Sequence, residues 1–100
     1  MRIAAGLHPH NAKHWGPEIE ERLRALLHDK RTSCLGEIGL DYHYDLSPRE
    51  DQERAFRAQV RIAKEAGLPV MLHVREAHDD ALAIMRDEGW PEAGCILHCF

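Results

Sequence analysis

Residues 47–74 decide the fold, and they read SPREDQERAFRAQVRIAKEAGLPVMLHV. The first part predicts a helix that opens with a capping box, in which Ser47 caps, Pro48 takes the first turn and Glu50 reaches back. Gly67 is expected to stop this helix. The apolar residues that follow predict a strand with both faces buried, as in a parallel sheet.

Three more apolar runs resemble this strand, and helical patterns separate them. The predicted strands are residues 3–7, 32–38, 68–74 and 94–98, with helices predicted from Pro17, Ser47 and about Ala77. Strands separated by helices imply right-handed parallel crossovers. The order predicts an α/β fold with about four parallel strands and three intervening helices. Residues 39–46 are expected to form a loop, and Leu26 and Leu82 are expected to face the sheet.

The composition excludes some classes of protein. The chain has 100 residues, 44% of them hydrophobic, and a net charge of −4. The sequence contains no basic stripe of the kind that neutralises many nucleic-acid phosphates. Contact with a polyanion is therefore expected to be local, through a metal or a few arginines. No apolar run approaches the ~18 residues of a membrane span. Three cysteines without a disulfide pattern favour a cytoplasmic location.

Side chains that commonly bind metals lie at all four predicted strand ends. His8, Glu37, His73 and His98 would meet at one edge, because function gathers at the carboxyl ends of parallel strands. Any one of these histidines could instead be a structural residue, but their joint placement favours a metal site. Imidazoles with one carboxylate suit Zn²⁺, Mn²⁺ or Fe²⁺. Glu37 is the best candidate to bridge two ions, which a histidine cannot do.

Three further positions have more than one interpretation. His8 and His10 could form a metal-binding H-x-H pair, or belong to a loop that turns at Pro9. Arg75 lies two residues past His73 and could contact a phosphate, or pair with a neighbouring carboxylate. Asp41 could orient a metal ligand or cap a turn. The spacing alone does not choose between these alternatives.

The combined motifs resemble the TatD family of metal-dependent deoxyribonucleases. They are GLHPH at 6–10, GEIGLDY at 36–42, AKEAGLPV at 63–70, LHVREA at 72–77 and HCF at 98–100. The resemblance covers essentially the whole chain. It implies a TIM-like (β/α)₈ barrel that hydrolyses phosphodiester bonds of DNA, with divalent metal ions, expected to be two per complete site (Mg, Mn or Zn).

The resemblance also implies roles for single residues. Glu37 would be catalytic and bridge the metals, and His73 and His98 would bind one of them. The family's metal-binding H-x-H lies at the end of the first barrel strand, whereas GLHPH follows the second. His8 and His10 would therefore have rim or substrate-side roles, with Arg75 and Asp41 supporting the substrate or the ligands.

Length points to a partial barrel. A full barrel needs about 250 residues, so residues 1–100 are expected to be one partial domain that lacks the first strand and the C-terminal half. The family's H-x-H pair and a late aspartate ligand are absent from this sequence. Two alternatives remain open: a related barrel hydrolase acting on C–N or ester bonds, and a truncated product that is inactive or serves as an interaction module.

Overall fold

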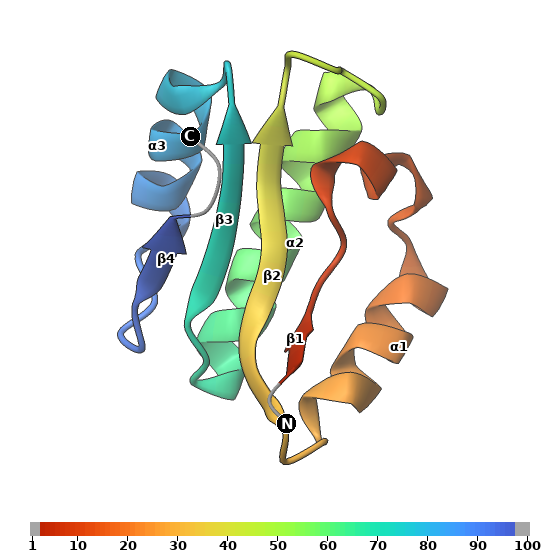
Figure 1. Ribbon diagram of the computed structural model, residues 1–100, viewed down its shortest axis with the longest axis vertical. Coiled ribbons are helices and arrows are strands. Elements are labelled where there is room, and N and C mark those ends of the chain that lie inside the picture. Colours follow the sequence, from red (N-terminus) through yellow and green to blue (C-terminus); the bar gives the residue numbers. More distant parts are fainter. Residues whose placement is uncertain (1–2, 98–100) are drawn as a thin grey trace.

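The computed structural model describes residues 3–97, which form a single parallel sheet flanked by helices (Figure 1). In chain order the elements are β1 (Ile3–Ala5), the 3₁₀ helix η1 (Pro9–His14), α1 (Pro17–Leu27), β2 (Thr32–Asp41), α2 (Arg49–Ala66), β3 (Val70–Arg75), α3 (His78–Glu88) and β4 (Cys95–Leu97). The strands pair in the order β1-β2-β3-β4, all parallel. The predicted α/β order is confirmed, and the sheet is open, as expected for part of a barrel.

Alternation along β3 explains how the sheet is covered. Val70, Leu72 and Val74 belong to the buried core, whereas Met71 and Arg75, on the other face, are only partly buried. Helix α2 lies behind β2 and β3 in Figure 1 and contributes buried apolar side chains to the same core. The core therefore sits between α2 and one face of the sheet.

Strand β2 is longer than the sequence predicted. Gly39, Leu40 and Asp41 continue it and pair with His73, Val74 and Arg75 of β3, so the expected loop from residue 39 is wrong. Gly39 permits this extension because its φ is +143° and a Cβ there would overlap the His73 carbonyl oxygen. The extension carries Asp41 to the carboxyl edge of the sheet.

The predicted capping box at Ser47 is also wrong. Helix α2 starts at Arg49, with Pro48 as a cap residue that makes no side-chain hydrogen bond. The Ser47 hydroxyl instead donates to the carbonyl of His10 at 2.8 Å and accepts the Lys13 N–H at 3.1 Å. A tertiary contact has replaced the local cap, and it ties the start of α2 to η1.

Strand β1 ends at Ala5, two residues earlier than predicted. A side chain of α2 satisfies the backbone beyond it. Gln59 accepts the Leu7 N–H at 2.7 Å and donates to the Leu7 carbonyl at 3.2 Å and to Ala55 at 3.1 Å. Gln59 is 1% exposed, so it substitutes for a strand partner and fixes the chain just before His8.

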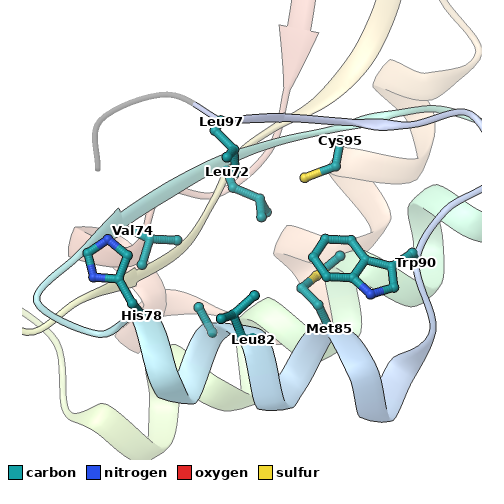
Figure 2. A pocket seen from close by; sticks show the side chains of 9 residues that line it. Leu72, Val74, His78, Leu82, Met85, Trp90, Cys95 and Leu97 are labelled. Atoms are coloured by element: carbon teal, nitrogen blue, oxygen red, sulfur yellow. The ribbon is translucent and has the colours of Figure 1, made fainter.

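Two leucines expected to face the core are exposed. Leu26 on α1 is 48% exposed. Helix α1 packs against β1, and this three-residue strand is too short to cover the whole apolar stripe of the helix. Leu82 is 42% exposed and lines an open apolar cavity of about 270 Å³ between α3, β3 and β4 (Figure 2). Trp90, Met85 and Cys95 line the same cavity. In a complete barrel each strand is followed by a helix that covers such a face.

We expect Gly39→Ala to destabilise the chain strongly. The substitution adds a Cβ where the His73 carbonyl lies and forces a strained φ on alanine, which costs more than about 2 kcal/mol. Urea unfolding measures the loss. Gly16→Ala is the matched control, because nothing lies within 4 Å of its added Cβ and its φ of −175° suits any residue. Equal stability of the two variants would contradict this view of β2.

We expect Gln59→Leu to lower the free energy of unfolding by more than the change in side-chain packing alone would. The leucine leaves the Leu7 N–H and carbonyl unsatisfied in a part-buried setting, at about 1–3 kcal/mol for each group. Urea unfolding tests this, with Glu50→Leu as an exposed control on the same helix. Amide exchange at Leu7 that stays as slow as in the parent chain would argue against the anchoring role.

Candidate metal centre

The candidate site lies at the carboxyl edge of the sheet, at the top of Figure 1, where β2 and β3 end. Asp41 is the last residue of β2 and His73 lies in β3. His8 is the cap residue at the start of η1, not the last residue of a strand. His10, the second residue of η1, completes the group. Three segments of the chain thus meet at one edge.

Asp41 is the centre of the hydrogen bonds at this edge. Its carboxylate is fully buried, and Oδ2 lies 2.8 Å from Nε2 of His10 and 2.9 Å from Nε2 of His73. The other oxygen, Oδ1, accepts the backbone N–H groups of His43 and Tyr44, both at 3.0 Å. Asp41 therefore holds two imidazoles and the following turn at once. Asp41 caps the turn, and its contacts with the two imidazoles are those that an orienting residue would make.

The ionisation of Asp41 follows from these bonds. Burial alone would raise its pKa, but the Tyr44 N–H and the His73 and His10 rings together hold the pKa well below its ordinary value. An ionised carboxylate only accepts hydrogen bonds, so both Nε2 atoms carry protons. In its neutral form each ring then keeps its lone pair on Nδ1. This is the carboxylate–histidine arrangement that commonly orients metal ligands.

Three histidine rings are packed together beside Asp41. The ring centroids of His8 and His10 are 4.2 Å apart, and those of His8 and His73 are 4.5 Å apart. Each residue offers one ring nitrogen such that the three nitrogens lie within 4.8 Å of one another. Imidazole nitrogens with a carboxylate behind them are a donor set that suits Zn²⁺ or Mn²⁺. The described residues therefore fit a divalent metal ion.

His8 differs from the other two rings. Its Nδ1 accepts the His10 N–H at 3.1 Å, so the neutral ring carries its proton on Nε2. Burial, with the nearby His73 and His10 rings, lowers the pKa of His8 to about 4. At neutral pH its Nε2 is a hydrogen-bond donor, and it lies 3.8 Å from Oε1 of Glu37. This geometry favours the predicted substrate-side role over direct ligation.

Glu37 lies at an irregularity in β2. Gly36 pairs with Met71 and Ile38 pairs with Leu72, so Glu37 is the extra residue of a β-bulge. Bulges re-aim a side chain and often lie beside active sites. Glu37 is partly buried and lies beside the histidine cluster, with its Oε1 3.8 Å from Nε2 of His8. The sequence predicted Glu37 at this strand but not the bulge.

A buried glutamine fixes the backbone of Asp41. The Gln52 Oε1 accepts the Asp41 N–H at 2.8 Å, and its Nε2 donates to the Asp41 carbonyl at 3.2 Å and to Ser47 at 2.9 Å. Gln59, seven residues later on α2, holds Leu7 in the same way. Helix α2 therefore positions the residues that carry both Asp41 and His8.

The predicted site residues are largely brought together. His8, Glu37, Asp41 and His73 lie at one edge. Arg75 lies two residues beyond His73, with its guanidinium 5.6 Å from the Tyr44 ring centroid. His98 lies outside the described residues, so its predicted role stays a prediction.

Two contributors have no role predicted from the sequence, Gln52 and Tyr44. For His10 the H-x-H spacing allows a ligand and the resemblance implies the rim, and in the structure it shares the Asp41 carboxylate with His73. The sequence pattern gives Gln52 only an ordinary helix position and assigns no role to Tyr44, which lies in the wall of the site. The Tyr-x-Tyr spacing after Asp41 was a signal for aromatic side chains at this edge. The Gln52 contact depends on tertiary packing and has no local signal.

Within residues 3–97, no helix combines the length and the apolar character that crossing a membrane requires.

Comparison with known proteins identifies similar chains. A curated protein from Klebsiella pneumoniae (strain 342), named 3'-5' ssDNA/RNA exonuclease TatD, is 41% identical over 98 residues, which cover 96% of this chain and 36% of that protein. The protein of the same name from Pantoea vagans (strain C9-1) is 46% identical over 98 residues, covering 96% and 37%. The chain thus spans little more than a third of the length of these relatives.

Solved structures agree with the sequence comparison. YJJV, a TatD homolog from Escherichia coli K12, superimposes with a TM-score of 0.87 at 32% identity, covering 99% of this chain and 39% of that one. A hydrolase TatD family protein from Entamoeba histolytica gives a TM-score of 0.83 at 25% identity, covering 99% and 35%. The model of the family described as TatD related DNase matches residues 1–100. The chain belongs to the TatD related DNase family.

Proposed function

We propose that this chain is part of a metal-dependent nuclease that hydrolyses phosphodiester bonds of DNA. The observation that carries the proposal is the buried Asp41 carboxylate, which holds His10 and His73 within a cluster of three imidazoles. Family membership supports it, because the relatives are named as exonucleases of single-stranded DNA and RNA. Single-stranded nucleic acid is therefore the proposed substrate.

The proposed metal ligands are Glu37, His73 and His98, with Glu37 bridging two ions in the complete site. The position of Glu37 at a bulge beside the cluster supports its part in this set. The contact of His10 with Asp41 supports adding His10 as a further ligand. Mg²⁺, Mn²⁺ or Zn²⁺ would activate water and neutralise charge on the phosphate.

The other residues of the site have proposed roles toward the substrate. His8, a neutral ring with its proton on Nε2, would donate a hydrogen bond to a phosphate oxygen. Arg75 would contact a neighbouring phosphate with its guanidinium. Asp41 would keep two imidazoles oriented without touching the substrate. With a net charge of −4, the chain would rely on the metals and these few donors to bind a polyanion.

The proposal includes a domain and a location. Residues 1–100 would form one segment of a barrel that is complete only in a longer protein. Among the described residues, Cys34 and Cys95 are free thiols, which supports a reducing, cytoplasmic location.

Metal binding by the chain itself tests the ligand set. We expect isothermal titration with Mn²⁺ or Zn²⁺ to show weak binding of one ion at most, lost in His73→Ala. Asp41→Asn should weaken binding about 10–100-fold, because the single amide oxygen cannot accept from the two imidazoles and from the two backbone N–H groups at once. His14→Ala, at an exposed histidine outside the cluster, is the matched control. Unchanged affinity in both His73→Ala and Asp41→Asn would refute the site.

Hydrolysis is tested with residues 1–100 placed in the matching segment of the Klebsiella pneumoniae relative. We expect this chimera to cleave single-stranded oligonucleotides in the presence of Mg²⁺ or Mn²⁺, and removal of metal with EDTA to abolish cleavage. Glu37→Ala should abolish it as well. Normal activity after Glu37→Ala would sink the assignment. Cleavage of amides or simple esters in place of oligonucleotides would favour the C–N or ester hydrolase alternative.

Substitution of His8 distinguishes metal ligation from substrate contact. We expect His8→Ala to leave the Mn²⁺ affinity of the chain within about two-fold, because its Nδ1 is already used by the His10 N–H. In the chimera the same variant should lower the cleavage rate about 10²-fold or more, as loss of a donor to a charged transition state does. A large loss of metal affinity in His8→Ala would instead make His8 a ligand.

A further inference from the structure

We infer that Tyr44 is a stacking platform for one unpaired base of the nucleic acid bound at this site. The inference rests on the proposed function and adds a residue that binds the substrate through its base. The base would lie next to the phosphate that the metal centre acts on. Because a base must be unpaired to stack on a side chain, the platform selects single strands.

The backbone of Tyr44 is fixed by the site itself. Its N–H donates to Oδ1 of Asp41 at 3.0 Å, and the other oxygen of the same carboxylate holds His10 and His73. Tyr44 therefore keeps a constant position relative to the histidine cluster. A substrate group that contacts Tyr44 is placed relative to the proposed metal centre by a single residue, Asp41.

The ring of Tyr44 forms part of the wall of the site. It meets the His10 ring edge-on, with the centroids 5.6 Å apart, and the His43 ring edge-on at 4.8 Å. The Arg75 guanidinium lies 5.6 Å from the ring centroid. The candidate phosphate contact therefore lies over the aromatic ring that also meets His10.

Burial does not explain this aromatic ring. Tyr44 is 57% exposed, and within residues 3–97 no hydrogen bond engages its hydroxyl. Tyr42 is a useful contrast, because its side chain is partly buried and its hydroxyl lies 2.8 Å from Asp80 Oδ2. Tyr42 has a structural role, whereas Tyr44 presents an aromatic surface beside the site.

The charge of the chain makes such a platform useful. A net charge of −4 gives little general attraction for a polyanion. Stacking on an aromatic side chain contributes about 1–3 kcal/mol per base and tolerates any base. Arg75 could contact the phosphate of the stacked nucleotide while Tyr44 contacts its base. Two short-range contacts would then supply affinity that net charge does not.

Binding of a short oligothymidylate to the 100-residue chain tests the inference. The oligonucleotide carries a 5′ fluorophore and phosphorothioate linkages, which slow cleavage, and anisotropy is measured with Mg²⁺ present. We expect Tyr44→Ala to weaken binding about 5- to 100-fold, as loss of one stacked base would, and Tyr44→Phe to bind like the parent chain. Trp90→Ala is the control, because Trp90 is 47% exposed but lines the cavity beside α3 instead of the site.

An abasic oligonucleotide makes the test specific for the base. The effect of Tyr44→Ala should disappear with the abasic strand, because that strand keeps the phosphates and sugars but offers no base to stack on the ring. Equal losses for normal and abasic strands, no loss in Tyr44→Ala, or no binding by the parent chain would each overturn the inference. A base-dependent loss in Tyr44→Ala, found together with a chimera that cleaves no oligonucleotide, would uphold the platform and contradict only the proposed function.

Discussion

The buried carboxylate of Asp41 is the interaction on which the site depends. It accepts hydrogen bonds from His10 and His73 through one oxygen and from the His43 and Tyr44 backbone through the other. An ionised carboxylate in a buried position is stable only when its oxygens are satisfied in this way. The same bonds orient the imidazoles and shape the turn, so the proposed metal-binding and substrate-facing parts of the site share one support.

The fold is arranged to deliver Asp41 to that position. Gly39 allows β2 to continue against β3 to the carboxyl edge, and Gln52 of α2 satisfies the Asp41 backbone on both sides. Gln59 of the same helix fixes Leu7, and with it the start of the segment that carries His8. One buried helix face therefore sets the relative positions of residues that are far apart in the sequence.

Local patterns predicted the element order, the end of α2 at Gly67 and the placement of Glu37 and His73 in neighbouring strands, because these depend on periodicity and turn chemistry. The structure places Glu37 within β2 and not at its end. Local patterns did not predict the bonds of Ser47, which reaches η1, or the extension of β2 through Gly39. Both depend on partners more than 30 residues away. His10 was expected at the rim because the resemblance places the family's H-x-H on another strand. No local pattern predicts its contact with Asp41, which joins two segments that only the folded sheet brings together.

The central claim is that Asp41 holds His10 and His73 ready for a divalent metal ion beside Glu37. Anomalous diffraction from crystals grown with Mn²⁺ tests it most directly. We expect a peak within bonding distance of a ring nitrogen of His73 and a carboxylate oxygen of Glu37, with Asp41 still contacting the His73 ring. A chain that shows no peak at this edge, or only peaks at exposed acidic side chains, would contradict the account.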